Sequence, residues 1–241
     1  MKKTLFSFIF LMLLALYCNA QNCNQKNNIQ KEYSMEEIMK IPEINADYEF
    51  FDNDTFFFAK GSLREHKKRI VDNDTVDCYA TDNRYQEYDK YKRMRRTLSR
   101  PYHGEVTEGD YSINPLIGIY KEFYKNGGIR VKGVTSWLGF AIGLMYYYDE
   151  EGNLIRTENH DEGFDFTIRE IFSYCINNNI SLERQKHKGW ETQILKSTSA
   201  NKSFWYIKYS DFTKGVGITI EIDAKTGEVT RIIEAPFVIG E

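Results

Sequence analysis

The chain has 241 residues and a formal net charge of −3, from 32 lysine and arginine residues against 35 aspartate and glutamate residues. This mildly acidic balance gives no electrostatic case for nucleic acid as a general partner. Aromatic residues make up 15% of the sequence, and 17 of them are tyrosine, which is typical of strand-rich structures and of contact surfaces.

Residues 1–20 have the pattern of a secretory signal peptide. Lys2 and Lys3 precede an apolar run from Leu5 to Leu16, and Ala20 closes a small-residue cleavage site. The run is about a dozen residues long, shorter than the roughly 20 that span a bilayer. We therefore expect cleavage after Ala20, a secreted or periplasmic location, and a protein that does not span the membrane.

Two further points concern this leader. A lipoprotein anchored at Cys18 is the less favoured alternative, because Tyr17 stands where a lipid-attachment motif has a small residue. Removing 20 residues from 241 leaves 221, and losing two lysines takes the charge from −3 to −5. That length suits one large domain or two small ones.

The segment after the leader is polar and then turns into short elements. Residues 21–33 are rich in Asn and Gln without periodicity, which predicts a disordered linker. Ser34 and Glu37 then form the pattern of a capping box, and Pro42 ends the short helix that they predict. The segments YEFF, TFFFA and TVDCYA between 48 and 80 predict strands. The tetrapeptide DNDT, at 52–55 and 72–75, lacks the later ligands of a calcium loop and predicts turns.

Residues 82–100 allow a helix or a strand. Tyr85, Tyr88 and Tyr91 recur every three residues, with Met94 after them, which favours a helix opened by Asp82. The same run of tyrosines also suits a strand.

The second half of this stretch is strongly basic, with Lys90, Lys92, Arg93, Arg95, Arg96 and Arg100 inside eleven residues. One interpretation is a docking patch for an acidic partner or an anionic glycan. The other is an ordinary solvated face, which most charge runs are.

Two hairpins repeat with a period of 25 residues. IGIYKEFYKNGGIRVKG (117–133) aligns with IGLMYYYDEEGNLIRTE (142–158), so that Gly127 matches Gly152. Each unit is an aromatic strand, a glycine-containing turn and a second strand, and the glycines supply the positive φ of a tight connection. Residues 149–151 then fall at a hairpin tip.

These residues resemble the MORN-variant hairpin repeats of secreted bacterial proteins, some of which are grouped with antitoxins. The resemblance covers about 115–160 and implies an interaction or scaffold module, not an active site. On it we base the candidate contact residues: Tyr120, Tyr124, Tyr146, Tyr147 and Tyr148. The basic residues Lys90, Lys92, Arg93, Arg95 and Arg96 are the second candidates.

After Gly163 the pattern changes to a helix followed by strands. Thr167 and Glu170 form a capping box, and an apolar stripe follows at helical spacing: Ile168, Ile171, Phe172, Cys175 and Ile176. SFWYIKYS and GVGITIEID predict strands, and IDAKTGEVTRII predicts a turn at 225–227 into a last strand. Residues 165–234 resemble PepSY-like domains, small helix-plus-hairpin modules of secreted proteins, some of them inhibitory segments of peptidases.

The residues of catalytic chemistry form no local motif. The four histidines are dispersed without metal-binding spacing, and no G-x-S-x-G elbow occurs. Cys175 is predicted to be a buried apolar residue, and a Cys78 to Cys175 disulfide stays open. A carboxylate pair from distant strands would leave no local trace. We predict no catalytic residue, no metal and no cofactor.

The sequence thus predicts an α+β protein, mostly antiparallel β hairpins with a C-terminal helix packed on a small antiparallel sheet. The expected domains are a hairpin-rich β domain at 34–162 and a PepSY-like unit at 163–241. The expected function is non-catalytic binding of a protein or glycan partner. The alternatives are an inhibitor or immunity-type protein of a secreted enzyme and a glycan-active hydrolase.

Overall fold

The computed structural model describes residues 33–52, 56–59, 64–100, 105–182, 192–199 and 201–237. The predicted signal peptide, Cys18, Cys23, nearly all of the linker and most of the first DNDT copy lie outside these residues. Among the described residues, no helix is both long and apolar enough to cross a membrane.

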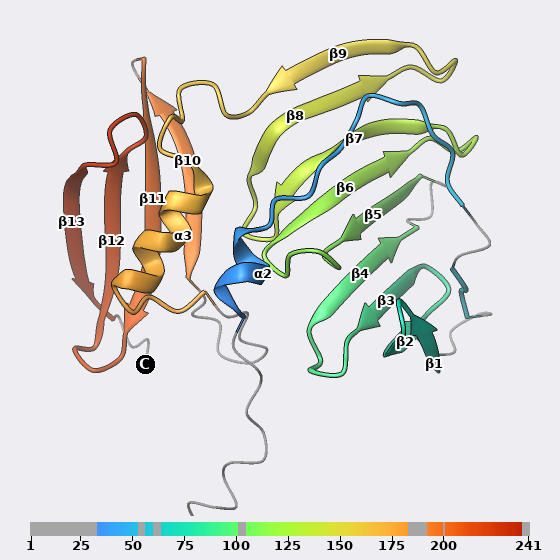
Figure 1. The fold of residues 1–241 in the computed structure, drawn as a ribbon, viewed down its shortest axis with the longest axis horizontal. Helices are drawn as coiled ribbons and strands as arrows, with labels where there is room; N and C mark the ends of the chain where they lie inside the picture. Colours follow the sequence, from blue (N-terminus) through green and yellow to red (C-terminus); the bar gives the residue numbers. More distant parts are fainter. Residues whose placement is uncertain are drawn as a thin grey trace, which may run out of the picture. The chain divides into compact units, whose positions relative to one another are not determined.

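Antiparallel strands dominate the described part of the chain, and they form two sheets (Figure 1). The nine strands of the first sheet lie side by side in chain order: β1 (Glu65–Val71), β2 (Asp74–Ala80), β3 (Arg84–Tyr88), β4 (Met94–Ser99), β5 (Val106–Asp110), β6 (Ile117–Phe123), β7 (Ile129–Ser136), β8 (Ala141–Tyr148) and β9 (Leu154–Asn159). The second sheet contains β10 (Gln193–Ser199), β11 (Lys202–Asp211), β12 (Val216–Asp223) and β13 (Val229–Pro236). The predicted antiparallel β character is confirmed.

The predicted 25-residue repeat forms two successive hairpins, β6–β7 and β8–β9. Gly127 and Gly152 occupy the same turn position, with φ of 89° and 92°. Their N–H groups donate to the carbonyl oxygens of Tyr124 and Asp149, at 2.9 and 3.2 Å. The prediction of two equivalent hairpins is confirmed, and residues 149–151 lie in the second turn.

Two of the three predicted early strands are wrong. Within 48–52 the only strand-like pairing is an isolated bridge from Phe50 to Gly128, and residues 56–59 are irregular. Apart from Phe50, which is exposed, the aromatic side chains there pack into the core: the Phe51 ring stacks on Phe56 with 5.7 Å between ring centroids, and Phe56 meets the edge of Tyr85. Only TVDCYA becomes a strand, β2.

Residues 82–100 form the hairpin β3–β4, so the helix interpretation is wrong and the strand interpretation is right. Tyr85 and Glu87 point into the core while Gln86 and Tyr88 point the other way, which is a period of two. The Asp89 carboxylate accepts the backbone N–H groups of Tyr91 and Arg93 at 2.8 and 2.9 Å and holds the turn.

The second DNDT copy forms the predicted turn between β1 and β2. Asp72 and Asn73 have φ of 53° and 66°, the left-handed conformation of a two-residue hairpin connection. Asp and Asn tolerate this conformation better than most residues.

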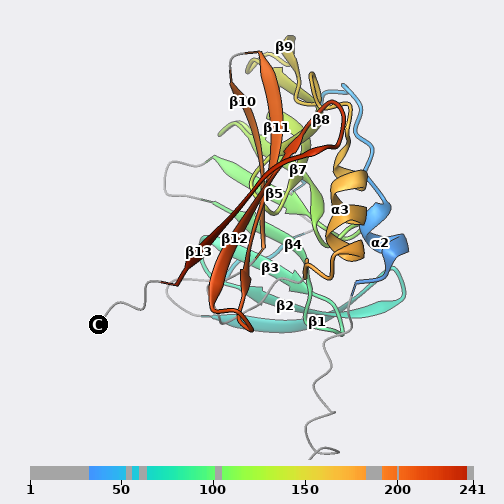
Figure 2. The same cartoon turned by 90° about the vertical axis from the view of Figure 1, so that its left-hand side faces the viewer.

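The predicted helices are present as α2 (Met35–Met39) and α3 (Ile168–Asn177), which lie beside each other (Figure 2). In α2, Ser34 Oγ accepts the Glu37 N–H and the Glu37 carboxylate accepts the Ser34 N–H, as predicted. In α3, the Thr167 N–H donates to the Glu170 carboxylate.

One core cluster joins α3, the second sheet and part of the first sheet. Its buried members include Ile168, Ile171, Phe172 and Cys175 of α3, Trp205 and Ile207 of β11, Ile218, Ile220 and Ile222 of β12, and Ile117, Val134 and Ile142 of the first sheet. Cys78 lies in a separate cluster. Both cysteines are free, so the disulfide that the sequence left open is not formed. The prediction of Cys175 as a buried apolar residue is confirmed. The predicted domain boundary at 162/163 falls between β9 and α3.

The inner face of the first sheet, which bears Cys78, Tyr85 and Tyr148, is covered by two segments: Phe56 and Phe57 pack on Tyr85, and the segment 40–52 runs across β6–β8 (Figure 1). Lys132 is 1% exposed on this face and donates to the Asp47 carbonyl and to the Glu49 carboxylate. Because the chain occupies this face over β6–β8, the opposite face, here called the outer face, is the open one.

Candidate functional site

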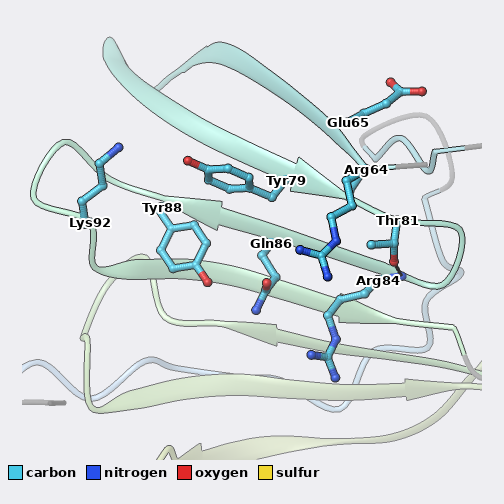
Figure 3. A pocket seen from close by; sticks show the side chains of 9 residues that line it. Arg64, Glu65, Tyr79, Thr81, Arg84, Gln86, Tyr88 and Lys92 are labelled. Carbon is cyan, nitrogen blue, oxygen red and sulfur yellow. Dashed lines mark hydrogen bonds between the residues drawn. The ribbon is translucent and has the colours of Figure 1, made fainter. Parts of the chain in front are cut away.

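The outer face of β1–β3 contains a pocket of about 450 Å³ (Figure 3). It is lined by Arg64, Glu65, Tyr79, Ala80, Thr81, Arg84, Gln86, Tyr88 and Lys92. Tyr79 is the cross-strand partner of Gln86, and residues directly opposite in a ladder share a face. The alternation that buries Cys78 and Tyr85 therefore presents Tyr79 and Gln86 to this pocket.

Two tyrosines give the pocket an aromatic wall. Tyr79 is 42% exposed, a large fraction for an aromatic side chain. His66 stacks on it with 4.6 Å between ring centroids, and Tyr88 meets it edge to face at 5.7 Å. The stacking fixes the Tyr79 ring while part of its surface stays open.

Two of the charged groups at the pocket are already paired. Lys92 donates to the Asp77 carboxylate, which also contacts His66 Nε2 at 3.0 Å. These hydrogen bonds, first that of Lys92 and then that of His66, lower the pKa of Asp77. Glu65 forms an ion pair with Lys67 at 3.0 Å.

The two arginines of the pocket are not paired. Arg64 precedes β1 and Arg84 begins β3, and both are exposed. Among the described residues, neither guanidinium has a carboxylate within ion-pair distance or a side-chain hydrogen bond. Figure 3 shows both groups extending over the same end of the pocket, beside Gln86 and Thr81. The pocket therefore carries two uncompensated positive charges.

The predicted basic run does not form one patch, because each of its five candidate residues has a carboxylate partner. The ion pairs are Lys90–Asp74 at 3.3 Å, Lys92–Asp77, Arg93–Asp89 at 2.7 Å, Arg95–Asp72 at 3.0 Å and Arg96–Asp110 at 2.8 Å. Only Lys92 lines the pocket. The charge of this run is largely cancelled by acids of the β1–β2 hairpin, of the β3–β4 turn and of β5.

The predicted tyrosine surface is divided between the two faces of the sheet. Tyr148 is 2% exposed and its hydroxyl donates to the Ala46 carbonyl at 2.8 Å, so its ring cannot be a contact residue, and that prediction is wrong. Tyr146 packs against the core cluster that contains Cys78, Tyr85 and Tyr148. Tyr120 and Tyr147 point to the outer face, where their hydroxyls donate hydrogen bonds to the carboxylates of Glu122 and Glu158, respectively.

Tyr124 lies at the end of β6 and ties the two repeated hairpins together. Its hydroxyl donates to the Tyr148 carbonyl at 2.7 Å. Asn126, in the same turn, donates to the Glu150 carbonyl at 3.4 Å. These contacts give the neighbouring tips a structural role.

Four residues of the pocket were not predicted from the sequence as site residues: Arg64, Arg84, Tyr79 and Gln86. A partial signal was present in the alternating segment TVDCYA. Cys78 is buried, so the next residue, Tyr79, lies on the other face of the same strand. Nothing in the local sequence links Arg64 to Arg84, since the β1–β3 meander brings them together.

A second pocket, of about 610 Å³, lies where the end of β9 meets the β10–β11 hairpin, and its lining includes His160, Glu162, Phe164 and Lys196. Lys196 donates to the carbonyls of Ala141 and His160 and to the Asp161 carboxylate, at 3.2, 2.8 and 2.7 Å. Burial lowers the pKa of Lys196. Its ammonium group thus serves to hold strands together.

Neither of these two pockets brings two carboxylates together: Glu65 lines the first and Glu162 the second. A glycoside hydrolase needs a facing pair. Across the described residues, no group of three or more His, Cys, Asp or Glu side chains is arranged to hold a metal ion.

Comparison with known proteins adds no assignment to this geometry. The chain matches no family model, no curated protein and no solved structure.

Proposed function

We propose that the protein is a non-catalytic binding protein and that its pocket over β1–β3 binds an anionic ligand. The observation that carries the proposal is the pair of uncompensated guanidinium groups, Arg64 and Arg84, at one end of the pocket. Two like charges that lie near each other repel, and an anion between them removes that repulsion. Guanidinium groups also bind planar anions through paired N–H donors.

The size of the effect follows from the charge of the donors. A hydrogen bond to a charged group contributes about 1.5–3 kcal/mol, which corresponds to about 10-fold to 100-fold in affinity per arginine. Removing both arginines should therefore abolish binding at ordinary ligand concentrations.

The proposal includes a secreted or periplasmic location, which rests on the pattern of residues 1–20. It also includes the expected α+β arrangement from residue 163 on, supported by the core that α3 shares with β11 and β12. In this arrangement the helix-plus-sheet unit supports the nine-stranded sheet, and the pocket belongs to the sheet.

The test is equilibrium binding of a fluorescent sulfated dextran oligomer and a fluorescent oligoglutamate to the full chain at about 0.15 M salt, where screening suppresses weak surface attraction. The variant R64Q/R84Q should lose at least 100-fold in affinity for the anion that binds. The control variant K125Q/K208Q removes two exposed lysine charges away from the pocket and should bind like the wild type. Equal binding by both double variants would refute the pocket as the anion site.

A further inference from the structure

We infer that the anionic ligand is an acidic sugar residue of a polysaccharide, carrying a carboxylate or a sulfate. This inference rests on the proposed function and adds the chemical class of the ligand.

The backbone of the two strands at the centre of the pocket is fully paired. β2 is paired on both sides, to β1 and β3, and β3 is paired to β2 and β4. An extended peptide binds a sheet by adding a strand to an open edge, where unpaired N–H and C=O groups are available. The face over β2 and β3, where Tyr79 and Gln86 lie, offers only side chains, so a peptide bound over these two residues would leave its own backbone groups without partners.

The centre of the pocket lacks the backbone donors of a compact phosphate site. Compact phosphate sites are built from backbone N–H groups at helix N-termini or in turns that form a nest. The residues at the centre of this pocket, Tyr79 and Gln86, lie within paired strands. Their backbone N–H groups are directed along the ladder, away from the pocket.

The pocket also offers neutral groups beside the arginines. The Gln86 carboxamide has no hydrogen-bond partner among the described residues and lies between Tyr79 and Arg84 in Figure 3. A carboxamide offers two N–H donors and an oxygen acceptor, a set that matches adjacent sugar hydroxyls. The open parts of Tyr79 and Tyr88 supply flat apolar surface with a hydroxyl at the rim.

The pocket has the size of a small-molecule site and continues along the outer face. A volume of about 450 Å³ lies within the range of small-molecule pockets. The cross-strand row that contains Tyr79 and Gln86 continues on the outer face through Thr97 to Gly109, over which the Tyr111 ring lies, and on to Tyr120. A polymer chain bound in the pocket therefore has a surface along which to extend.

The experiment measures dissociation constants of the full chain for four oligomers of matched length: oligogalacturonate, sulfated dextran, neutral dextran and oligoglutamate. We expect one acidic oligosaccharide to bind at least tenfold more tightly than oligoglutamate and neutral dextran, and the identity of that oligosaccharide tells carboxylate from sulfate. Q86L should weaken it about tenfold, the equivalent of one hydrogen-bonded group. The same substitution should leave any oligoglutamate binding unchanged, and circular dichroism checks that the variant is folded.

The outcomes separate the two claims. If oligoglutamate binds as tightly as both acidic sugars, or if Q86L weakens every anion equally, the sugar inference is overturned while the anion pocket stands. If none of the oligomers binds, or if R64Q/R84Q changes nothing, the proposed function fails as well.

Discussion

The two turn glycines of the repeated hairpins allow a matched test of the fold. Gly127 and Gly152 have almost the same positive φ, 89° and 92°, so replacing either by alanine carries the same backbone strain. That strain is about 1–2 kcal/mol for an L-residue in the left-handed region. Their surroundings differ. An added Cβ at Gly127 meets nothing nearer than Phe50 at 4.0 Å, whereas at Gly152 it meets the Tyr48 ring at 3.0–3.1 Å.

We therefore expect G127A to lower the free energy of unfolding by about 1–2 kcal/mol. G152A should lower it by about 2–4 kcal/mol, since the Tyr48 ring must also move and overpacking adds about 1–3 kcal/mol. The gain from a less flexible unfolded chain is the same for both variants and cancels in the comparison. Urea unfolding at neutral pH measures both values.

Tyr48 supplies the control. In a Y48L background the clash at position 152 is relieved, so the costs of G152A and G127A should become equal within about 0.5 kcal/mol, the usual limit of additivity. Equal costs in the wild-type background would refute the packing of Tyr48 against the second tip. If neither substitution changed the stability, the positive φ of the two turn glycines would be refuted.

Three further predictions concern the core and one partly buried ion pair. Burial would raise the pKa of Asp110, but the Arg96 guanidinium and the Ser112 N–H lower it below its usual range. The carboxylate therefore adds stability above its unfolded pKa of about 3.9 and loses it as the pH falls through the lower folded pKa. Urea unfolding should show a D110N deficit of about 1–2 kcal/mol at pH 7 that vanishes in acid; a deficit independent of pH would contradict this. Burial raises the pKa of the Cys78 and Cys175 thiols, that of Cys175 to about 12. In a C18S/C23S chain, iodoacetamide should therefore label these two cysteines only after unfolding. Labelling of the native protein would refute their burial. W205A should cost about 3–5 kcal/mol by thermal unfolding, and a cost below about 1 kcal/mol would contradict the packing of the shared core.

The elements predicted correctly are those with a complete local signal. β12 alternates without interruption, α3 has both a capping box and an apolar stripe, and the β6–β7 and β8–β9 turns contain glycine at the position that needs positive φ. In each case the local pattern agrees with the final packing.

The elements missed are those whose structure depends on distant partners. β1 is the sequence EHKKRIV, in which charged residues on an edge strand hide the alternation. The aromatic runs look like strands in the sequence, but the rings of Tyr48, Phe51 and residues 56–58 cover the inner face of the sheet. A high β-propensity indicates that aromatic side chains will be buried. It does not show whether their backbone pairs with a neighbouring strand.

The site could be predicted only in outline. One interpretation of the basic run was a docking patch for an acidic partner or an anionic glycan. Three of its residues are instead paired with Asp72, Asp74 and Asp77, which lie 15–23 residues earlier in the chain. The two arginines that line the pocket, Arg64 and Arg84, have no carboxylate partner among the described residues. Which cations keep a carboxylate partner is set by strand pairing, and a single sequence does not display it.

The most direct test of the central claim is an NMR titration that follows the arginine Nε–H signals while the acidic oligosaccharide is added, with signals assigned from R64Q and R84Q. The account predicts saturable shifts of the Arg64 and Arg84 signals, while Arg93, held by Asp89 and Glu37, stays unchanged. Binding that leaves both pocket arginines unshifted would contradict the assignment of the anion site to this pocket.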